Sequence, residues 1–336
     1  MNTYLITGAT GYIGSMLVKH ITKTDKEAHI TVIVRDRAKA ENMLPSAVHF
    51  VEADLTDRVQ MAALDCRCDY IIHCASITES VRMISHPVEV TESIVNTTQH
   101  VLELARRGSV KSMVYLSSME VYGSIDCQDG CRTTEEEALR GEVELLASRS
   151  CYPLGKRMAE NICHSYYKEY GVPVKIARLS QTFGEGVLPS DRRVFVQFAK
   201  AVKAGSDIVL HTQGHSMGNY CGIHDAISGI MTILEKGTSG EAYNVVNENN
   251  TMTIRQMAEF VADRIAGGKI KVAYDIAKDD RHGYAADTGL RLSGKKLMSL
   301  GWKPEEALED MYSQLIRFSP ETARQTIRCS SNSRHS

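Results

Sequence analysis

A tyrosine and a lysine stand four residues apart, at Tyr152 and Lys156. At this spacing both side chains lie on one face of a helix, which we expect over 153–170. A free phenol has a pKa near about 10 and is a poor base at neutral pH, but a neighbouring ammonium favours the phenolate. Tyr152 can then take a proton from a hydroxyl while hydride leaves the carbon. The pair predicts redox chemistry on an alcohol, although the same spacing is common on helix surfaces.

Two further polar groups follow an expected strand at 113–116. Ser118 and Glu120 come where that strand ends, and the carboxyl ends of parallel strands face the ligand crevice of a doubly wound sheet. Ser118 is a candidate hydrogen-bond donor to the reacting oxygen, and Glu120 is a candidate acid–base group. Glu120 can equally be a structural acceptor at the strand end.

A glycine-rich loop opens the first expected helix. Gly8 permits a tight turn, Gly11 lets the backbone approach a pyrophosphate, and Gly14 lets the helix pack close to the strand. The helix start, at Tyr12 and Ile13, offers free amide groups to the anion. The loop therefore predicts a nicotinamide dinucleotide site, with an ordinary turn as the alternative.

The end of the second expected strand decides which dinucleotide binds. An acidic residue there bonds the ribose 2′-hydroxyl of NAD, whereas an arginine accommodates the 2′-phosphate of NADP. Arg35 takes this position and favours NADP. Asp36 follows directly, so a shift of one residue favours NAD instead, and Arg35 on a solvated rim is the neutral interpretation.

The elements that position these residues alternate along the first half of the chain. Short apolar runs predict buried parallel strands, and helical patterns lie between them. We expect strands at 4–7, 30–34, 48–51, 70–73, 113–116 and 174–179, and helices at 12–23, 56–64, 87–107 and 153–170. The fold class is thus α/β, a doubly wound parallel Rossmann sheet with a smaller C-terminal α/β substrate lobe. We expect a dinucleotide-binding domain over 1–175, a substrate lobe over 176–318 with strands at 208–211 and 243–246 and helices near 253–266 and 304–317, and a flexible tail over 319–336.

The composition and net charge limit which classes of partner the protein can bind. Hydrophobic residues make up 43% and charged residues 24% of the 336 positions, and the net charge of -2 gives no bulk attraction to nucleic acid or to an anionic membrane. The sequence has no long apolar span and no leader-like N-terminus, which predicts a cytoplasmic protein. The nine cysteines lack the spacing of a zinc site, with Cys66/Cys68 and Cys127/Cys131 as weak pairs, so we expect no metal.

Several pieces together resemble the extended short-chain dehydrogenase/reductase family of nucleotide-sugar epimerases, dehydratases and decarboxylases, over about residues 1–318. In the family's order these are the glycine loop, Asp54-Leu55 after the third strand, Ala75 after the fourth, Asn96 in the next helix, and then Ser118, Tyr152 and Lys156. The resemblance implies that Asp54 contacts adenine, that Ala75 lies along the cofactor, and that Lys156 also bonds the nicotinamide ribose. Taken singly, Asp54 and Asn96 could be a turn residue and a core amide.

The resemblance also implies a reaction. Family members oxidise a C4 hydroxyl, transform the keto-sugar and usually return the hydride to a tightly bound cofactor. Glu120 looks like the glutamate of the dehydratase and decarboxylase motifs, although Met119 stands where many dehydratases carry an aspartate. We therefore expect C5-proton chemistry with Glu120 as base. A 4-epimerase, an NADP-dependent carbonyl reductase and a dinucleotide-sensing module are the alternatives.

The residues at the substrate-binding positions differ from the family pattern. Gln181 stands where an asparagine usually contacts substrate phosphate, and Gly218 replaces an arginine that usually grips the diphosphate. Arg193 and Arg281 are the remaining substrate candidates. Relatives often dimerise through two helices of the first domain, which implies a homodimer through 87–107 and 153–170.

Overall fold

A computed structural model describes residues 1–65, 67–125, 131–276 and 288–317. Arg281, the 319–336 tail, Cys66 and Cys127 lie outside the described residues. Among the described helices, none has the length and apolar character needed to cross a bilayer.

Seven parallel strands form the central sheet, in the order β10-β6-β5-β4-β1-β2-β3. All six expected strands of the first half are present, with ends shifted by a residue or two. From β1 the chain builds the sheet outward through β2 and β3, then returns to the other side of β1 for β4. In doubly wound sheets such a reversal point, here at the carboxyl ends of β1 and β4, is where ligands bind. The strands are β1 Thr3–Thr7, β2 His29–Val34, β3 His49–Glu52, β4 Tyr70–His73, β5 Ser112–Ser118, β6 Val174–Leu179 and β10 Ala242–Val245.

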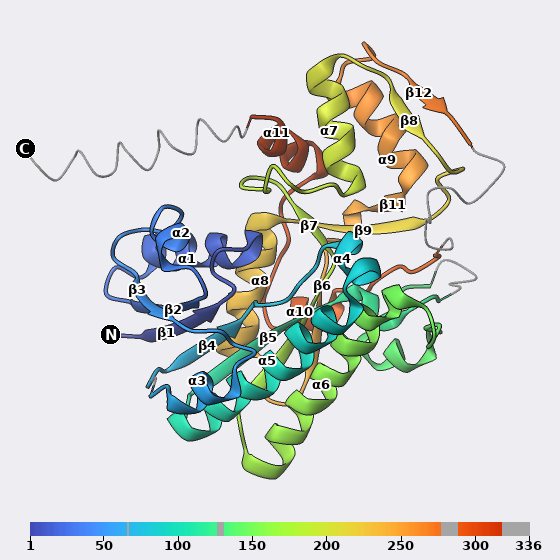
Figure 1. The fold of residues 1–336 in the computed structure, drawn as a ribbon. Helices are drawn as coiled ribbons and strands as arrows, with labels where there is room; N and C mark the ends of the chain where they lie inside the picture. Colours follow the sequence, from blue (N-terminus) through green and yellow to red (C-terminus); the bar gives the residue numbers. More distant parts are fainter. Residues whose placement is uncertain (66, 126–130, 277–287, 318–336) are drawn as a thin grey trace, which may run out of the picture.

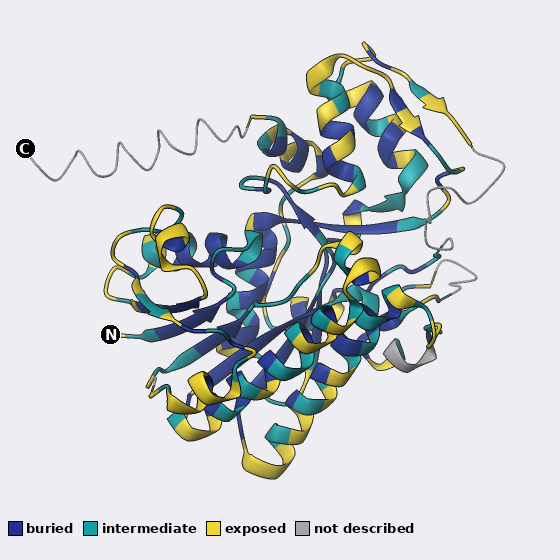
Figure 2. Ribbon diagram, in the orientation of Figure 1, coloured by how far each residue is buried: buried dark blue, intermediate teal, exposed yellow. Residues whose placement is uncertain are grey.

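Helices cover both faces of the sheet, so its strands are buried (Figures 1 and 2). On one face α5 (Pro87–Gly108) and α6 (Cys151–Tyr170) run side by side. Pro87 starts α5 at a position that needs no amide donor, and the helix buries an apolar stripe that includes Val90, Ile94 and Val101. The other helices of this layered unit are α1 Tyr12–Thr24, α2 Arg37–Glu41, α3 Arg58–Ala63, α4 Ser80–Ser85, α8 Ile223–Lys236 and α10 Lys295–Met298.

A smaller lobe stands over the carboxyl edge of the sheet (Figure 1). Its core includes Phe183 stacked on Phe195, with ring centroids 4.4 Å apart. The sequence patterns predicted neither α7 nor α8. The elements of this lobe are β7 Gln181–Phe183, α7 Val194–Ala204, β8 Ile208–Leu210, β9 Met217–Gly222, β11 Thr251–Thr253, α9 Ile254–Phe260 with its π-helical continuation Val261–Ile265, β12 Val272–Tyr274 and α11 Leu308–Arg317.

The expected border at residue 175 stays a prediction. β10 lies well beyond it in sequence but completes the central sheet by pairing with β6. The chain thus leaves the sheet for the smaller lobe and returns to it.

Candidate active site

Helix α6 places the tyrosine and lysine against the end of β5. Tyr152 and Lys156 are both buried, as i, i+4 neighbours in the first turns of α6. The Lys156 ammonium donates a 2.8 Å hydrogen bond to the Leu116 carbonyl oxygen and lies 5.8 Å from the centroid of the Tyr152 ring. Ser118, the last residue of β5, is hydrogen-bonded to Tyr152. The three residues predicted from separate segments therefore meet at the carboxyl edge of the sheet.

Burial dominates the acid–base properties of this pair. It raises the pKa of the Tyr152 phenol, and the nearby Glu120 charge raises it further. The Ser118 hydrogen bond and the charges of Arg193 and Arg149 act in the opposite direction. Burial also lowers the pKa of Lys156 to about 8. The Tyr152 phenol is therefore protonated at neutral pH, and added positive charge beside it favours the phenolate.

Glu120 lies two residues beyond Ser118, in the short helix η1 (Met119–Tyr122). Both of its carboxylate oxygens accept hydrogen bonds from Arg149, at 2.9 and 3.1 Å. Arg149 belongs to η4 (Ser148–Ser150), which leads directly into α6. The sequence patterns did not predict this residue, although its place three positions before Tyr152 puts it near the site.

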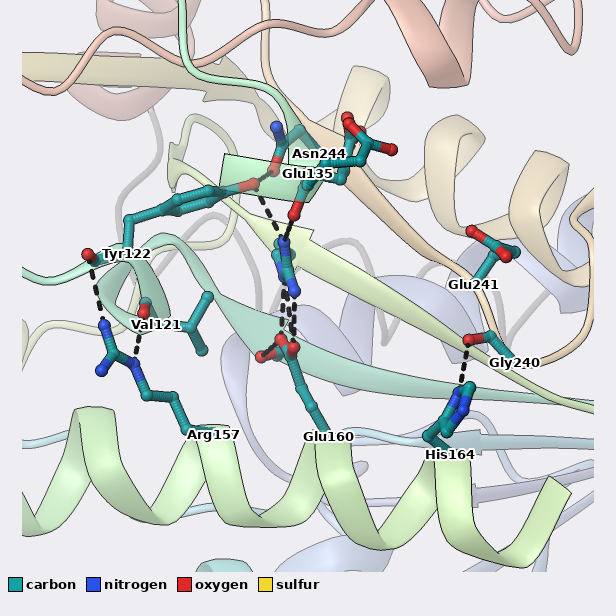
Figure 3. Close-up of polar contacts among 12 residues, drawn as sticks. Val121, Tyr122, Glu135, Arg157, Glu160, His164, Gly240, Glu241 and Asn244 are labelled. Carbon is teal, nitrogen blue, oxygen red and sulfur yellow. Dashed lines mark hydrogen bonds and ion pairs between the residues drawn. The ribbon is translucent and has the colours of Figure 1, made fainter. Parts of the chain in front are cut away.

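A buried polar network between α6 and its neighbours holds the segment that follows β5 (Figure 3). Glu160, one turn beyond Lys156, pairs with Arg178 of β6 at 2.8 Å and accepts a 2.6 Å hydrogen bond from the Ser117 hydroxyl. Arg178 also donates to the Tyr122 hydroxyl at 3.1 Å. On the same helix, Arg157 donates to the carbonyl oxygen of Val121 at 2.6 Å. Side chains of α6 thus hold the segment that carries Ser118 and Glu120.

The glycine loop runs along the crevice beside β4. Gly8 has a φ of +67°, and a Cβ there would lie 2.7 Å from the Ala75 backbone nitrogen. A Cβ on Gly14 would overlap the Gly8 carbonyl oxygen. Gly11 caps α1 without a side-chain bond to the first amides of the helix. The loop backbone has no side chains that would block a pyrophosphate, and the first amides of α1 are not capped by a side chain. These residues therefore fit a dinucleotide.

His73, at the end of β4, is a buried structural residue next to this loop. Its ring nitrogens lie 2.7 Å from the Thr7 hydroxyl and 3.3 Å from the Thr98 hydroxyl. Burial, followed by the charge of Lys156, lowers the pKa of His73 to about 3. The imidazole is therefore neutral and locks β4 to β1 and α5.

The structure places the other cofactor candidates around the same edge. Asp54 accepts from the Thr56 amide at 2.8 Å and so forms a turn, and Leu55 is buried behind it. The Asn96 amide is half-buried and has no protein hydrogen-bond partner among the described residues. Arg35 directly follows β2 and is exposed, whereas the Asp36 carboxylate caps α2 at the Lys39 amide.

Tyr12 and Ile13 have different surroundings at the start of α1. Ile13 packs against the core of the sheet domain. Tyr12 packs against this core and also against the core of the smaller lobe, and its buried hydroxyl has no hydrogen-bond partner among the described residues. Tyr12 therefore links the glycine loop to the smaller lobe, while its backbone stays at the helix start.

The smaller lobe contributes Gln181 and Arg193. Gln181 starts β7 two residues beyond Leu179, the register partner of Ser118. Arg193 precedes α7, pairs with Asp191 and lies 4.7 Å from the centroid of the Phe195 ring. Its charge lowers the pKa of Tyr152, which places it within electrostatic reach of the reacting group.

The surroundings of Gly218 explain why this chain has no arginine at that position. A Cβ on Gly218 would overlap the hydroxyl and ring of Tyr220 on the same strand. Tyr220 is fully buried and packs edge-on against Phe183. No side chain fits at position 218 while Tyr220 keeps this place.

A glycine loop at the reversal point of a parallel sheet, with a tyrosine–lysine pair beside it, defines a dinucleotide-dependent enzyme of the short-chain dehydrogenase type. A family model described as the NAD dependent epimerase/dehydratase family matches residues 4–246, more than half of the chain. The chain belongs to this family, whose members in the comparisons below modify nucleotide sugars.

Similar curated proteins include several decarboxylases. UDP-glucuronic acid decarboxylase 1 of Xenopus tropicalis is 26% identical over 317 residues, covering 94% of this chain and 71% of that protein. UDP-glucuronic acid decarboxylase 5 of Arabidopsis thaliana is 27% identical over 314 residues, covering 91% and 86%. The dTDP-D-glucose 4,6-dehydratase of Dictyostelium discoideum is 28% identical over 251 residues, covering 72% and 57%.

Solved structures share the fold. A UDP-glucose 4-epimerase of Thermotoga maritima with UDP-glucose has a TM-score of 0.80 at 20% identity, covering 97% of this chain and 99% of that one. A dTDP-glucose 4,6-dehydratase of Streptomyces venezuelae with NAD and TYD has a TM-score of 0.75 at 24% identity, covering 94% and 96%. These likenesses confirm the Rossmann-type α/β architecture.

Proposed function

We propose that this protein modifies a nucleotide sugar by transient oxidation of the C4 hydroxyl with a tightly bound nicotinamide dinucleotide. The observation that carries the proposal is the meeting of Ser118, Tyr152 and Lys156 at the carboxyl edge of the sheet. Gly8 and Gly14 leave room for the dinucleotide at the adjacent reversal point. Family membership gives the reaction its class.

The side chains divide the first step between them. Tyr152 takes the proton of the C4 hydroxyl, Ser118 bonds the same oxygen, and the Lys156 ammonium favours the phenolate. When bound, the nicotinamide ring supplies the hydride acceptor. Gln181 and Arg193 contact the substrate from the smaller lobe, and Arg193 offers a planar fork for a phosphate or carboxylate.

The cofactor contacts follow from the elements around the crevice. Gly8, Gly11 and the first amides of α1 hold the pyrophosphate, and Ala75 lies along the dinucleotide. Asp54, Leu55 and Asn96 complete the cofactor candidates. Arg35 favours NADP, since it stands exposed directly after β2 while the Asp36 carboxylate caps a helix. Stronger thermal stabilisation of the cofactor-free protein by NAD than by NADP contradicts this preference.

The middle step uses Glu120 in C5 chemistry of the dehydratase or decarboxylase type. In a 4,6-dehydration Glu120 takes the C5 proton and passes it to the C6 hydroxyl, which leaves as water. The hydride would then return to C6 while a proton from solvent is added at C5. In a decarboxylation the C6 carboxylate leaves as carbon dioxide from the 4-keto acid, and Glu120, protonated from solvent, gives its proton to the C5 carbanion. The curated decarboxylases similar to this chain favour the second form.

The 4-epimerase is the second candidate, and it requires Glu120 to be only a structural acceptor for Arg149. Solvent deuterium separates the two. Dehydration and decarboxylation place deuterium at C5 of the product, whereas 4-epimerisation leaves C5 unlabelled. Wild-type-like turnover of a Glu120→Gln variant removes Glu120 from the mechanism.

The test of the overall proposal starts with mass spectrometry of ligands that co-purify with the protein, followed by a panel of nucleotide sugars. We expect conversion of one of them with no net change in absorbance at 340 nm. Steady oxidation of added NADPH supports the carbonyl reductase instead. Absence of any turnover, with dinucleotide bound, supports a sensing module.

The proposed assembly is a homodimer through α5 and α6, which lie side by side on one face of the sheet (Figure 1). Analytical ultracentrifugation at micromolar concentration tests it.

A further inference from the structure

The Arg149–Glu120 pair spans the two segments that carry the reacting groups. Arg149 lies in the turn before α6, and Glu120 lies in the turn after β5. The two hydrogen bonds, at 2.9 and 3.1 Å, form the bidentate fork that arginine makes with a carboxylate. The side chains are 39% and 30% exposed, so the pair is partly accessible to solvent.

The pair is electrostatically coupled to Tyr152. The Glu120 charge opposes ionisation of the Tyr152 phenol, and the Arg149 charge favours it. Other charged or titratable groups also face this phenol, and they come from β5, α6 and the smaller lobe. They are Tyr115, Lys156 and Arg193, with Ser118 as its hydrogen-bond partner.

The Glu120 carboxylate and an ionised Tyr152 would repel each other, because both carry negative charge. A carboxylate beside a phenolate places like charges together, which favours protonation of one of them. Arg149 lies where it removes this repulsion, because it binds Glu120 through both oxygens and adds positive charge near Tyr152.

We propose that Arg149 is a positioning residue that acts through Glu120: it fixes the carboxylate beside Tyr152 and compensates its charge, so that both groups can take part in proton transfer. The proposal rests on the proposed function for the roles of the two groups. A purely structural ion pair would instead hold η4 against η1 and have no effect on proton transfer.

The first experiment measures the pH dependence of hydride transfer to the bound cofactor in a single turnover, followed at 340 nm. We expect the rate of hydride transfer to rise with pH. In Arg149→Met the ascending limb of this pH–rate profile moves to higher pH by about one unit. In Glu120→Gln it moves to lower pH, and in the double variant it returns close to that of the parent protein. Arg149→Lys, which keeps the charge but not the fork, shifts the limb less than Arg149→Met.

The matched control is Arg106→Met, which removes a bidentate pair with Glu103 on the surface of α5. This variant leaves the limb unmoved. An unmoved limb in Arg149→Met, or a double variant that behaves like Arg149→Met alone, overturns the proposal.

A second measurement does not depend on the substrate. Tyrosine labelled with ¹³C at Cζ reports ionisation of Tyr152 in the cofactor-loaded protein, with Tyr152→Phe assigning the signal. The proposal expects this signal to titrate at higher pH in Arg149→Met. A signal that titrates alike in both proteins, or in neither, overturns it. If no nucleotide sugar reduces the cofactor, the proposed function fails while this titration still decides the role of Arg149.

Discussion

The Glu160 carboxylate of α6 and the Arg178 guanidinium of β6 form a buried ion pair with a nitrogen–oxygen distance of 2.8 Å. Glu160 also accepts a 2.6 Å hydrogen bond from the hydroxyl of Ser117, one residue before Ser118. Glu160 therefore joins α6, which carries Tyr152 and Lys156, to the end of β5, which carries Ser118. Burial works to lower the pKa of Arg178, but the hydrogen bond and charge of Glu160 outweigh it and raise the pKa, so the guanidinium stays charged.

Removal of Glu160 should strongly destabilise the fold. Glu160→Ala leaves the Arg178 charge buried without its carboxylate, which we expect to lower the free energy of unfolding by about 3–5 kcal/mol. Urea denaturation measures it. Glu169→Ala, at an exposed position on the same helix, is the control and should change stability by less than about 0.5 kcal/mol. Equal effects of the two variants contradict the role of the pair.

His73 should make the protein sensitive to acid. Its pKa is lowered to about 3 in the folded state, against about 6.5 in the unfolded chain, so the unfolded state binds the extra proton first. The stabilisation is complete above about pH 6.5 and decreases as the pH falls toward 3. We expect a loss of roughly 2 kcal/mol by pH 5 in urea unfolding. A His73→Gln variant should lose less over this range, and parallel losses in the two proteins contradict the prediction.

Arg193 should affect substrate binding more than fold stability. Arg193→Ala removes a charge that faces Tyr152 from the smaller lobe, and we expect KM for the nucleotide sugar to rise about tenfold. Arg192→Ala removes the neighbouring exposed arginine and serves as the control. If the two variants give the same KM, Arg193 does not contact the substrate.

Gly218 should tolerate no side chain while Tyr220 is present. Gly218→Ala forces a Cβ into the Tyr220 ring, which we expect to cost about 1–3 kcal/mol of stability. In a Tyr220→Ala background the same change should cost little, because the overlapping ring is gone. Additive effects in chemical denaturation show that Tyr220 is not the obstacle.

Much of the sheet domain could be predicted from the sequence. The runs that form β1 to β6 are apolar because helices cover both faces, and glycine, serine, tyrosine and lysine follow one another in the family's order. Helices α7 and α8 were missed. Both begin without a side-chain cap, at Arg193 and Gly222, so the usual signal of a helix start is absent.

The missing parts of the site are contacts between distant segments. Glu120 and Arg149 are 29 positions apart, and the packing of η1 against α6, the helix that follows η4, brings them together. The absence of an arginine at Gly218 was visible in the sequence, but its cause lies in the ring of Tyr220. Motif order predicts which residues act, whereas partners that tune them depend on packing.

The central claim is that Tyr152 is the base for transient oxidation of a sugar hydroxyl. Rapid mixing of cofactor-loaded protein with the nucleotide sugar that it converts tests this claim most directly, with absorbance at 340 nm as the measure of hydride transfer. Tyr152→Phe should slow the transient by about 10²- to 10⁴-fold while cofactor binding is retained. Tyr166→Phe, on the same helix, should leave it unchanged. A transient of normal rate in Tyr152→Phe contradicts the claim.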